Sequence, residues 1–178
     1  MLSLMEAGAA ALFLSIVFTP TLIRSLTRRR IGQQIHEDVP RSHVVKAGTP
    51  TAGGALIVLA AIFGYLVGHL GEFRTVSRSA VLVLALIVAY GVVGLVDDLI
   101  GVRNSRNLGL NKRTKFGLQV VLAVGFAVAA WKWAGATTSI SFTRYDLPGW
   151  HLGAVVWIIF ATFVVVAASN AVNLTDGL

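Results

Sequence analysis

The segment SAVLVLALIVAYGVVGLVDD, residues 79–98, joins a long apolar run to two adjacent carboxylates. Residues 79–96 contain no charged side chain, and about 20 residues of this kind cross the hydrocarbon core of a bilayer. A carboxylate at the edge of a bilayer is costly unless it is hydrated, paired or bound to a cation. The segment therefore predicts a membrane-spanning helix that carries Asp97 and Asp98 to the boundary between lipid and water.

Similar apolar stretches recur along the 178-residue chain, which is 56% hydrophobic and only 13% charged. Soluble domains carry about 25% charged residues. The first stretch is followed rather than preceded by arginines, which favours a retained helix over a cleaved signal peptide. We predict an all-α fold, a polytopic transmembrane helix bundle that forms a single integral-membrane domain over residues 1–178. Its five spans are expected at about 7–26, 52–70, 79–97, 116–134 and 152–170.

The 15 basic residues are distributed unevenly among the connecting segments. Eleven of them lie in residues 24–46 and 103–115, and the other four, Arg74, Arg78, Lys132 and Arg144, lie in or close to the other two connectors. Because Lys and Arg concentrate in cytoplasmic loops, this places the side with Asp97 and Asp98 in the cytoplasm. The net charge of +7 would suggest nucleic acid for a soluble protein, but the hydropathy makes it a signal of topology, and we expect no nucleic-acid partner. The chain contains no cysteine, which excludes disulfides and thiolate metal sites.

The adjacent carboxylates of Asp97 and Asp98 repel each other unless a cation lies beside them. Oxygen ligands of this kind suit Mg²⁺ better than softer metals. The alternative is a hydrated pair at the end of a helix, neutralised by Arg103 or Arg106. Carboxylates are rare this close to a membrane, so the pattern favours a functional pair.

Two further sets of polar residues lie at the expected cytoplasmic ends of helices. Lys115 and Gln119 are four residues apart and share a helix face, although snorkelling to the interface is a simpler explanation for the lysine. Asn170, Asn173 and Asp176 recur every third residue, so they line one face if the fifth helix continues past its span. The amides of the two asparagines need partners, which a nucleotide base, a hydrated metal or neighbouring helices would supply.

The segment KAGTPTAGG, residues 46–54, precedes the second apolar stretch. Its glycines allow close approach of the backbone, and Pro50 stiffens the turn. The expected result is a helix N-terminus with free N–H groups beside Lys46, which suits a phosphate. A plain helix cap is the alternative, since glycine-rich turns are common punctuation.

Taken together, these motifs closely resemble those of the phospho-N-acetylmuramoyl-pentapeptide-transferase family. The four motifs stand in the family's order over nearly the whole chain: RSHVVKAGTPTAGG at 41–54, GLVDD at 94–98, NLGL at 107–110 with Lys115 and Gln119 after it, and NAVNLTDGL at 170–178. The resemblance implies a multi-pass protein of the bacterial cell membrane with its active site on the cytoplasmic face. The intact family has twice as many transmembrane helices, so the chain resembles its N-terminal half.

The resemblance also implies an activity and a cofactor. Phospho-MurNAc-pentapeptide would pass from UDP-MurNAc-pentapeptide to undecaprenyl phosphate, giving lipid I and UMP in the first membrane step of peptidoglycan synthesis, with Mg²⁺ bound. Asp97 would orient or deprotonate the lipid phosphate, and Lys115 would neutralise phosphate charge. Asp98 and Asp176 would serve the metal. The expected substrate-binding residues are Lys46, Thr49, Gln119, Asn170, Asn173 and Asp176.

Several alternatives stay open. A sister enzyme that transfers HexNAc-1-phosphate from a UDP-sugar to polyprenyl phosphate would share the aspartates and the asparagine motif. An ion-coupled transporter would use the aspartate pair for an ion, although transporter sites usually lie near the midplane of the bilayer. A covalent aspartyl-phosphate is an alternative to direct attack, and a homodimer is an alternative to a monomer. The family's later metal-binding aspartate and histidine-rich loop would follow Leu178, so we expect residues 1–178 alone to be inactive.

Overall fold

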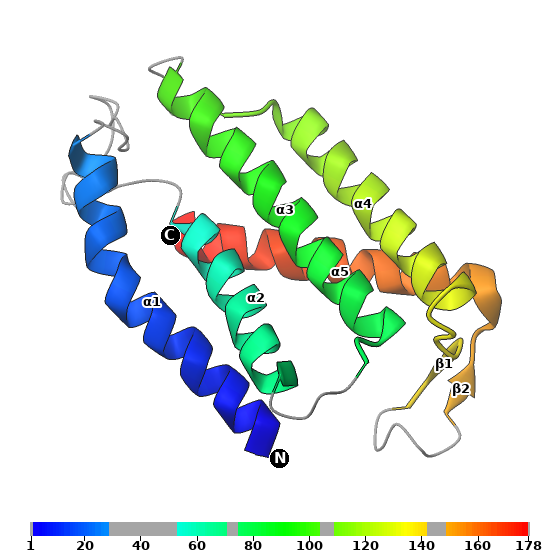
Figure 1. Ribbon diagram of the computed structural model, residues 1–178. Coiled ribbons are helices and arrows are strands. Elements are labelled where there is room, and N and C mark those ends of the chain that lie inside the picture. Colours follow the sequence, from blue (N-terminus) through cyan, green and yellow to red (C-terminus); the bar gives the residue numbers. More distant parts are fainter. Residues whose placement is uncertain (1, 29–52, 71–74, 104–108, 142–148, 178) are drawn as a thin grey trace. The chain divides into compact units, whose positions relative to one another are not determined.

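The computed structural model is built from α-helices and one short β-hairpin (Figure 1). It describes residues 2–28, 53–70, 75–103, 109–141 and 149–177. The helices of this part are α1 (Leu2–Arg28), α2 (Gly54–Leu70), α3 (Arg78–Arg103), α4 (Lys112–Lys132) and α5 (Gly153–Gly177). The strands β1 (Ser139–Ile140) and β2 (Trp150–His151) lie between α4 and α5. The predicted all-α class is confirmed, and the hairpin is a small addition to it.

Four helices of the described chain are long and apolar enough to cross a membrane. They are α1, α3, α4 and the Gly153–Val172 part of α5. Helix α2 is also strongly apolar but has 17 residues, slightly fewer than the about 20 that a full crossing needs. The apolar windows of α1 and α3 contain no buried residue, which suits helices that face lipid. The chain is a multi-pass membrane protein, and the five span boundaries predicted from the sequence stay predictions.

Two helices extend beyond the spans that the sequence suggested. Helix α3 continues to Arg103, so Asp97 and Asp98 lie within it rather than at its end. The reason is local, because residues 99–103 contain no proline and only one glycine to stop the helix. Helix α5 continues to Gly177. Asn170, Asn173 and Asp176 therefore lie on one helix, as the prediction that they share a face requires.

The chain divides into two compact units. The first consists of Met1–Val76 and Ile87–Lys115, and therefore holds α1, α2, the greater part of α3 and the first turn of α4. The second consists of Ser77–Leu86 and Phe116–Leu178, with the hairpin and α5. The two polar clusters described in the next subsection each lie within a single unit, one in the first and the other in the second.

In the first unit, glycines bring the helices close together. Helices α1 and α2 run side by side (Figure 1), and a Cβ atom on Gly68 would lie 2.9 Å from the Cβ of Ala7. Gly64 stands one turn earlier on α2 and also faces α1. This spacing of small residues is the one that lets membrane helices approach closely. Gly91 does the same for α3, because a Cβ there would lie 2.7 Å from a methyl group of Val58 on α2.

In the second unit, α4 buries one narrow face that consists of Gln119, Ala123, Ala127 and Ala130. The positive φ of Gly135, 72°, ends the turn that follows α4, a conformation that glycine adopts without strain. The hairpin then pairs Ser139 with His151 and Ile140 with Trp150. Arg78 at the start of α3 donates a hydrogen bond to the carbonyl of Trp133 at 3.1 Å, which satisfies a carbonyl group just past the end of α4.

Candidate active site

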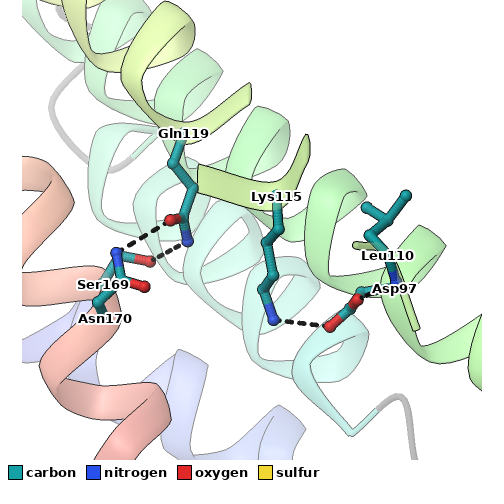
Figure 2. Close-up of polar contacts among 6 residues, drawn as sticks. All are labelled: Asp97, Leu110, Lys115, Gln119, Ser169 and Asn170. Atoms are coloured by element: carbon teal, nitrogen blue, oxygen red, sulfur yellow. Dashed lines mark hydrogen bonds and ion pairs between the residues drawn. The ribbon is translucent and has the colours of Figure 1, made fainter. Parts of the chain in front are cut away.

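Asp97 on α3 has a partner for each of its carboxylate oxygens (Figure 2). Lys115 Nζ donates to Oδ2 at 2.6 Å, and the backbone N–H of Leu110 donates to Oδ1 at 2.7 Å. The side chains of Lys115 and Asp97 are 23% and 20% exposed, so water reaches both only partly. Charge-assisted hydrogen bonds of this length are stronger than neutral ones. The carboxylate is therefore held in one orientation, with a cation beside it.

The start of α4 places Lys115 at this position. The side-chain oxygen of Asn111 accepts a hydrogen bond from the N–H of Arg113 at 3.1 Å, and the Asn111 carbonyl accepts one from the N–H of Lys115 at 2.9 Å. Asn111 is thus the N-cap of α4, a position that favours asparagine. The cap fixes the first turn of the helix, and Lys115 is the residue of that turn that reaches Asp97.

Gly109 allows the chain before α4 to approach α3. A Cβ atom at this position would lie 2.5 Å from the backbone oxygen of Asp97 and 2.8 Å from its Cγ. Real Cβ atoms essentially never come this close, so only glycine fits without a shift of the backbone. From the sequence, this glycine was only one residue of the NLGL motif, with no role assigned to it. Its place within the NLGL motif, between Asp97 and Lys115 in the sequence, was the available signal.

A second cluster links α4 to α5 within the second unit (Figure 2). Gln119 is only 4% exposed, and its Oε1 accepts a hydrogen bond from Asn170 Nδ2 at 2.9 Å. Its Nε2 donates to Ser169 Oγ at 3.3 Å. The amide of Asn170 also donates to the carbonyl of Val166 at 2.8 Å. Ser169 was not singled out in the sequence, because a lone serine in an apolar helix carries no pattern.

The other predicted site residues fall into three groups. Asp98 follows Asp97 on α3 and therefore points about 100° further around the helix. Asn173 and Asp176 lie on the last turns of α5, where the structure describes the backbone only. Lys46 and Thr49 lie outside the described residues. Within the described part, no group of three or more His, Cys, Asp or Glu side chains forms a metal site.

Comparison with known proteins gives consistent matches. Residues 80–178 match the family described as Glycosyl transferase family 4. The chain is 45% identical over 185 residues to the phospho-N-acetylmuramoyl-pentapeptide-transferase of Saccharopolyspora erythraea, 41% over 195 residues to that of Corynebacterium kroppenstedtii and 44% over 188 residues to that of Mycobacterium leprae. Each alignment covers 100% of this chain and 51%, 53% and 52% of the respective relative. The chain thus spans about half the length of the curated relatives it matches.

Proposed function

The chain belongs to glycosyl transferase family 4, and from this premise we propose that it transfers phospho-MurNAc-pentapeptide from UDP-MurNAc-pentapeptide to undecaprenyl phosphate. The products are lipid I and UMP. The substrates are proposed from the activity that the relatives are named for, and these relatives are 41–45% identical over the whole chain. The observation that carries the chemistry is the Asp97–Lys115 pair, a partly shielded carboxylate and ammonium 2.6 Å apart on membrane helices.

In this proposal, an oxygen of the lipid phosphate attacks the β-phosphorus of the UDP-sugar. A new P–O bond forms to the lipid phosphate, and the bond from the β-phosphorus to the bridging oxygen breaks, so that UMP leaves with the bonding electrons. Such transfers depend on positioning and charge neutralisation more than on covalent chemistry. Lys115 binds the lipid phosphate, and Asp97 orients it.

Direct attack is preferred to an aspartyl-phosphate intermediate at Asp97. Both oxygens of this carboxylate accept strong hydrogen bonds, from Lys115 and from the N–H of Leu110. Hydrogen-bond donors withdraw electron density from the oxygen that would have to attack phosphorus, and they hold it in place. The same contacts suit a group that orients a second phosphate rather than one that forms a bond to the donor.

The donor set is compatible with Mg²⁺, the cofactor that we propose. Asp98 and Asp176 offer oxygen ligands, and Mg²⁺ in phosphoryl-transfer enzymes usually takes one or two carboxylates together with substrate phosphates and waters. Mg²⁺ would supply neutralisation of the charge on the diphosphate. Lys46 and Thr49 are proposed to contact phosphate, and Asn173 and Asp176 to serve the nucleotide. The site is proposed to open to the cytoplasm, because eleven of the 15 basic residues lie in the connectors on that side.

The test is a transfer assay with the full-length protein in membranes, using undecaprenyl phosphate and either radiolabelled UDP-MurNAc-pentapeptide or radiolabelled UDP-GlcNAc. We expect lipid-linked label and UMP only from the first donor, and only with Mg²⁺ present. Label transferred from UDP-GlcNAc instead would identify the sister HexNAc-1-phosphate activity. No transfer from either donor by a correctly inserted protein would reject the enzyme proposal.

A further inference from the structure

We infer that Gln119 is a positioning residue that acts through Asn170, and that it does not itself contact the substrate. This inference rests on the proposed function and refines it, because the family resemblance placed Gln119 among the expected substrate-binding residues. Gln119 and Asn170 lie on different helices of the second unit, 51 positions apart in the sequence.

The burial of Gln119 supports this role. Its side chain is 4% exposed, on the same face of α4 as the buried Ala123 and Ala127. A carboxamide in an apolar environment costs free energy unless its donor and acceptor are both paired. Here the acceptor oxygen pairs with Asn170 and the donor nitrogen with Ser169. A group that is buried and bonded at both ends is well placed to fix a helix and poorly placed to meet a soluble nucleotide.

Asn170 differs from Gln119 because its side chain is exposed. Its amide nitrogen donates both to Gln119 on α4 and to the carbonyl of Val166, one turn earlier on α5. These two bonds fix the torsion angles of the Asn170 side chain. Gln119 is thus the buried end of a network whose exposed end is Asn170.

The network also sets the direction of the residues that follow on α5. Asn173 and Asp176 come three and six residues after Asn170 on the same helix, and each residue turns the helix by about 100°. A small rotation of α5 therefore redirects both positions together. Misplacement of reacting groups by about 1 Å can cost on the order of 100-fold in rate.

The experiment is a double-mutant cycle in the full-length protein with Gln119→Ala, Asn170→Ala and both changes together. We expect Gln119→Ala to raise the KM for UDP-MurNAc-pentapeptide about 10-fold, because two hydrogen bonds are lost, and to leave the KM for undecaprenyl phosphate unchanged. The double variant should lose no more than Asn170→Ala alone. Exchanging the pair, with Gln119→Asn and Asn170→Gln, should restore part of the loss. Losses that multiply in the double variant would overturn the inference, because two independent substrate contacts behave in that way.

Thr162→Val is the matched control, because it removes a buried hydroxyl of α5 that has no hydrogen-bond partner within the described part of the chain. We expect it to leave both KM values unchanged. If Thr162→Val raised the KM for UDP-MurNAc-pentapeptide as much as Gln119→Ala does, the effect would come from general packing of α5 and not from the hydrogen-bond network. That result would overturn the inference.

Hydrogen–deuterium exchange gives a readout that does not depend on activity. Gln119→Ala should speed exchange in the last turns of α5, whereas Thr162→Val should not. Equal exchange in the wild type and Gln119→Ala would overturn the positioning role whatever the assay shows. If the wild type transfers no sugar phosphate but the exchange effect is present, the proposed function fails and the network stands.

Discussion

Gly109→Ala is the substitution for which the structure gives the most direct expectation. The added methyl group would lie 2.5 Å from the backbone oxygen of Asp97 and 2.8 Å from its Cγ. The backbone oxygen belongs to α3, six residues before the end of the helix, and the helical backbone restrains its movement. The segment that carries Gly109 must therefore withdraw, and the N–H of Leu110 withdraws with it.

The size of the effect follows from the bond that is lost. The Leu110 N–H donates to Asp97 Oδ1 at 2.7 Å, and a hydrogen bond to a charged group contributes about 1.5–3 kcal/mol. If this energy orients the carboxylate for the reaction, its loss lowers kcat by about 10- to 100-fold. The KM for UDP-MurNAc-pentapeptide should change little, because we place Asp97 on the side of the lipid phosphate.

The assay compares initial rates of lipid I formation by Gly109→Ala and by Gly117→Ala in the full-length protein. Gly117 is the matched control because a Cβ there meets nothing within 4 Å in the described chain, and alanine is the better helix former. We expect the control to keep wild-type activity and insertion. A Gly109→Ala enzyme with more than about half of the wild-type kcat would show that the Leu110 contact is not worth the energy assigned to it.

Three further predictions concern the same protein. Asp97→Asn and Asp98→Asn should each lower the transfer rate by at least about 100-fold at saturating Mg²⁺ with normal membrane insertion, and near-normal rates would remove both carboxylates from the mechanism. Lys115→Ala should impair transfer far more than Lys112→Ala, since Lys115 carries the ion pair with Asp97; equal effects in rate measurements would point to general interfacial charge instead. Gly68→Ala should destabilise the protein by about 1–3 kcal/mol through overpacking against α1, seen as a lower melting temperature in detergent, whereas Gly8→Ala, with open space around it, should not.

Much of the fold could be predicted because length and hydropathy are enough to define helices in a membrane chain. The segment at 79–96 predicted α3 by its length and its lack of charged side chains. The end of α3 was less predictable. A helix can continue through hydrated polar residues where no proline or pair of glycines interrupts it. The strands of the hairpin are two residues long, too short to show an alternating pattern. The Pro-Gly pair at 148–149 was a local signal of a turn.

The candidate site was predictable as a set of residues but not as a set of contacts. Helix periodicity placed Lys115 and Gln119 on one face of α4, yet it could not tell that one pairs with Asp97 and the other with Asn170. Such pairing depends on the packing of helices that are distant in the sequence. The roles of Gly109 and Leu110 depend on the close approach of their backbone to Asp97 on α3. The only sign of this approach in the sequence is the glycine itself.

The charges of the Asp97–Lys115 pair set a requirement for the rest of the site. The two side chains form one ion pair, so together they present no net charge, and a bilayer boundary tolerates such a pair better than a lone carboxylate. The reaction brings a lipid phosphate and a nucleotide diphosphate together, and both are anionic. A neutral pair can orient one phosphate but cannot offset the charge of all three. We therefore expect the transition state to depend on cations beyond Lys115, namely Lys46 and Mg²⁺. The rate should accordingly fall more steeply on removal of Mg²⁺ than on loss of any one lysine, because a divalent cation between phosphates stabilises more charge than a single ammonium group.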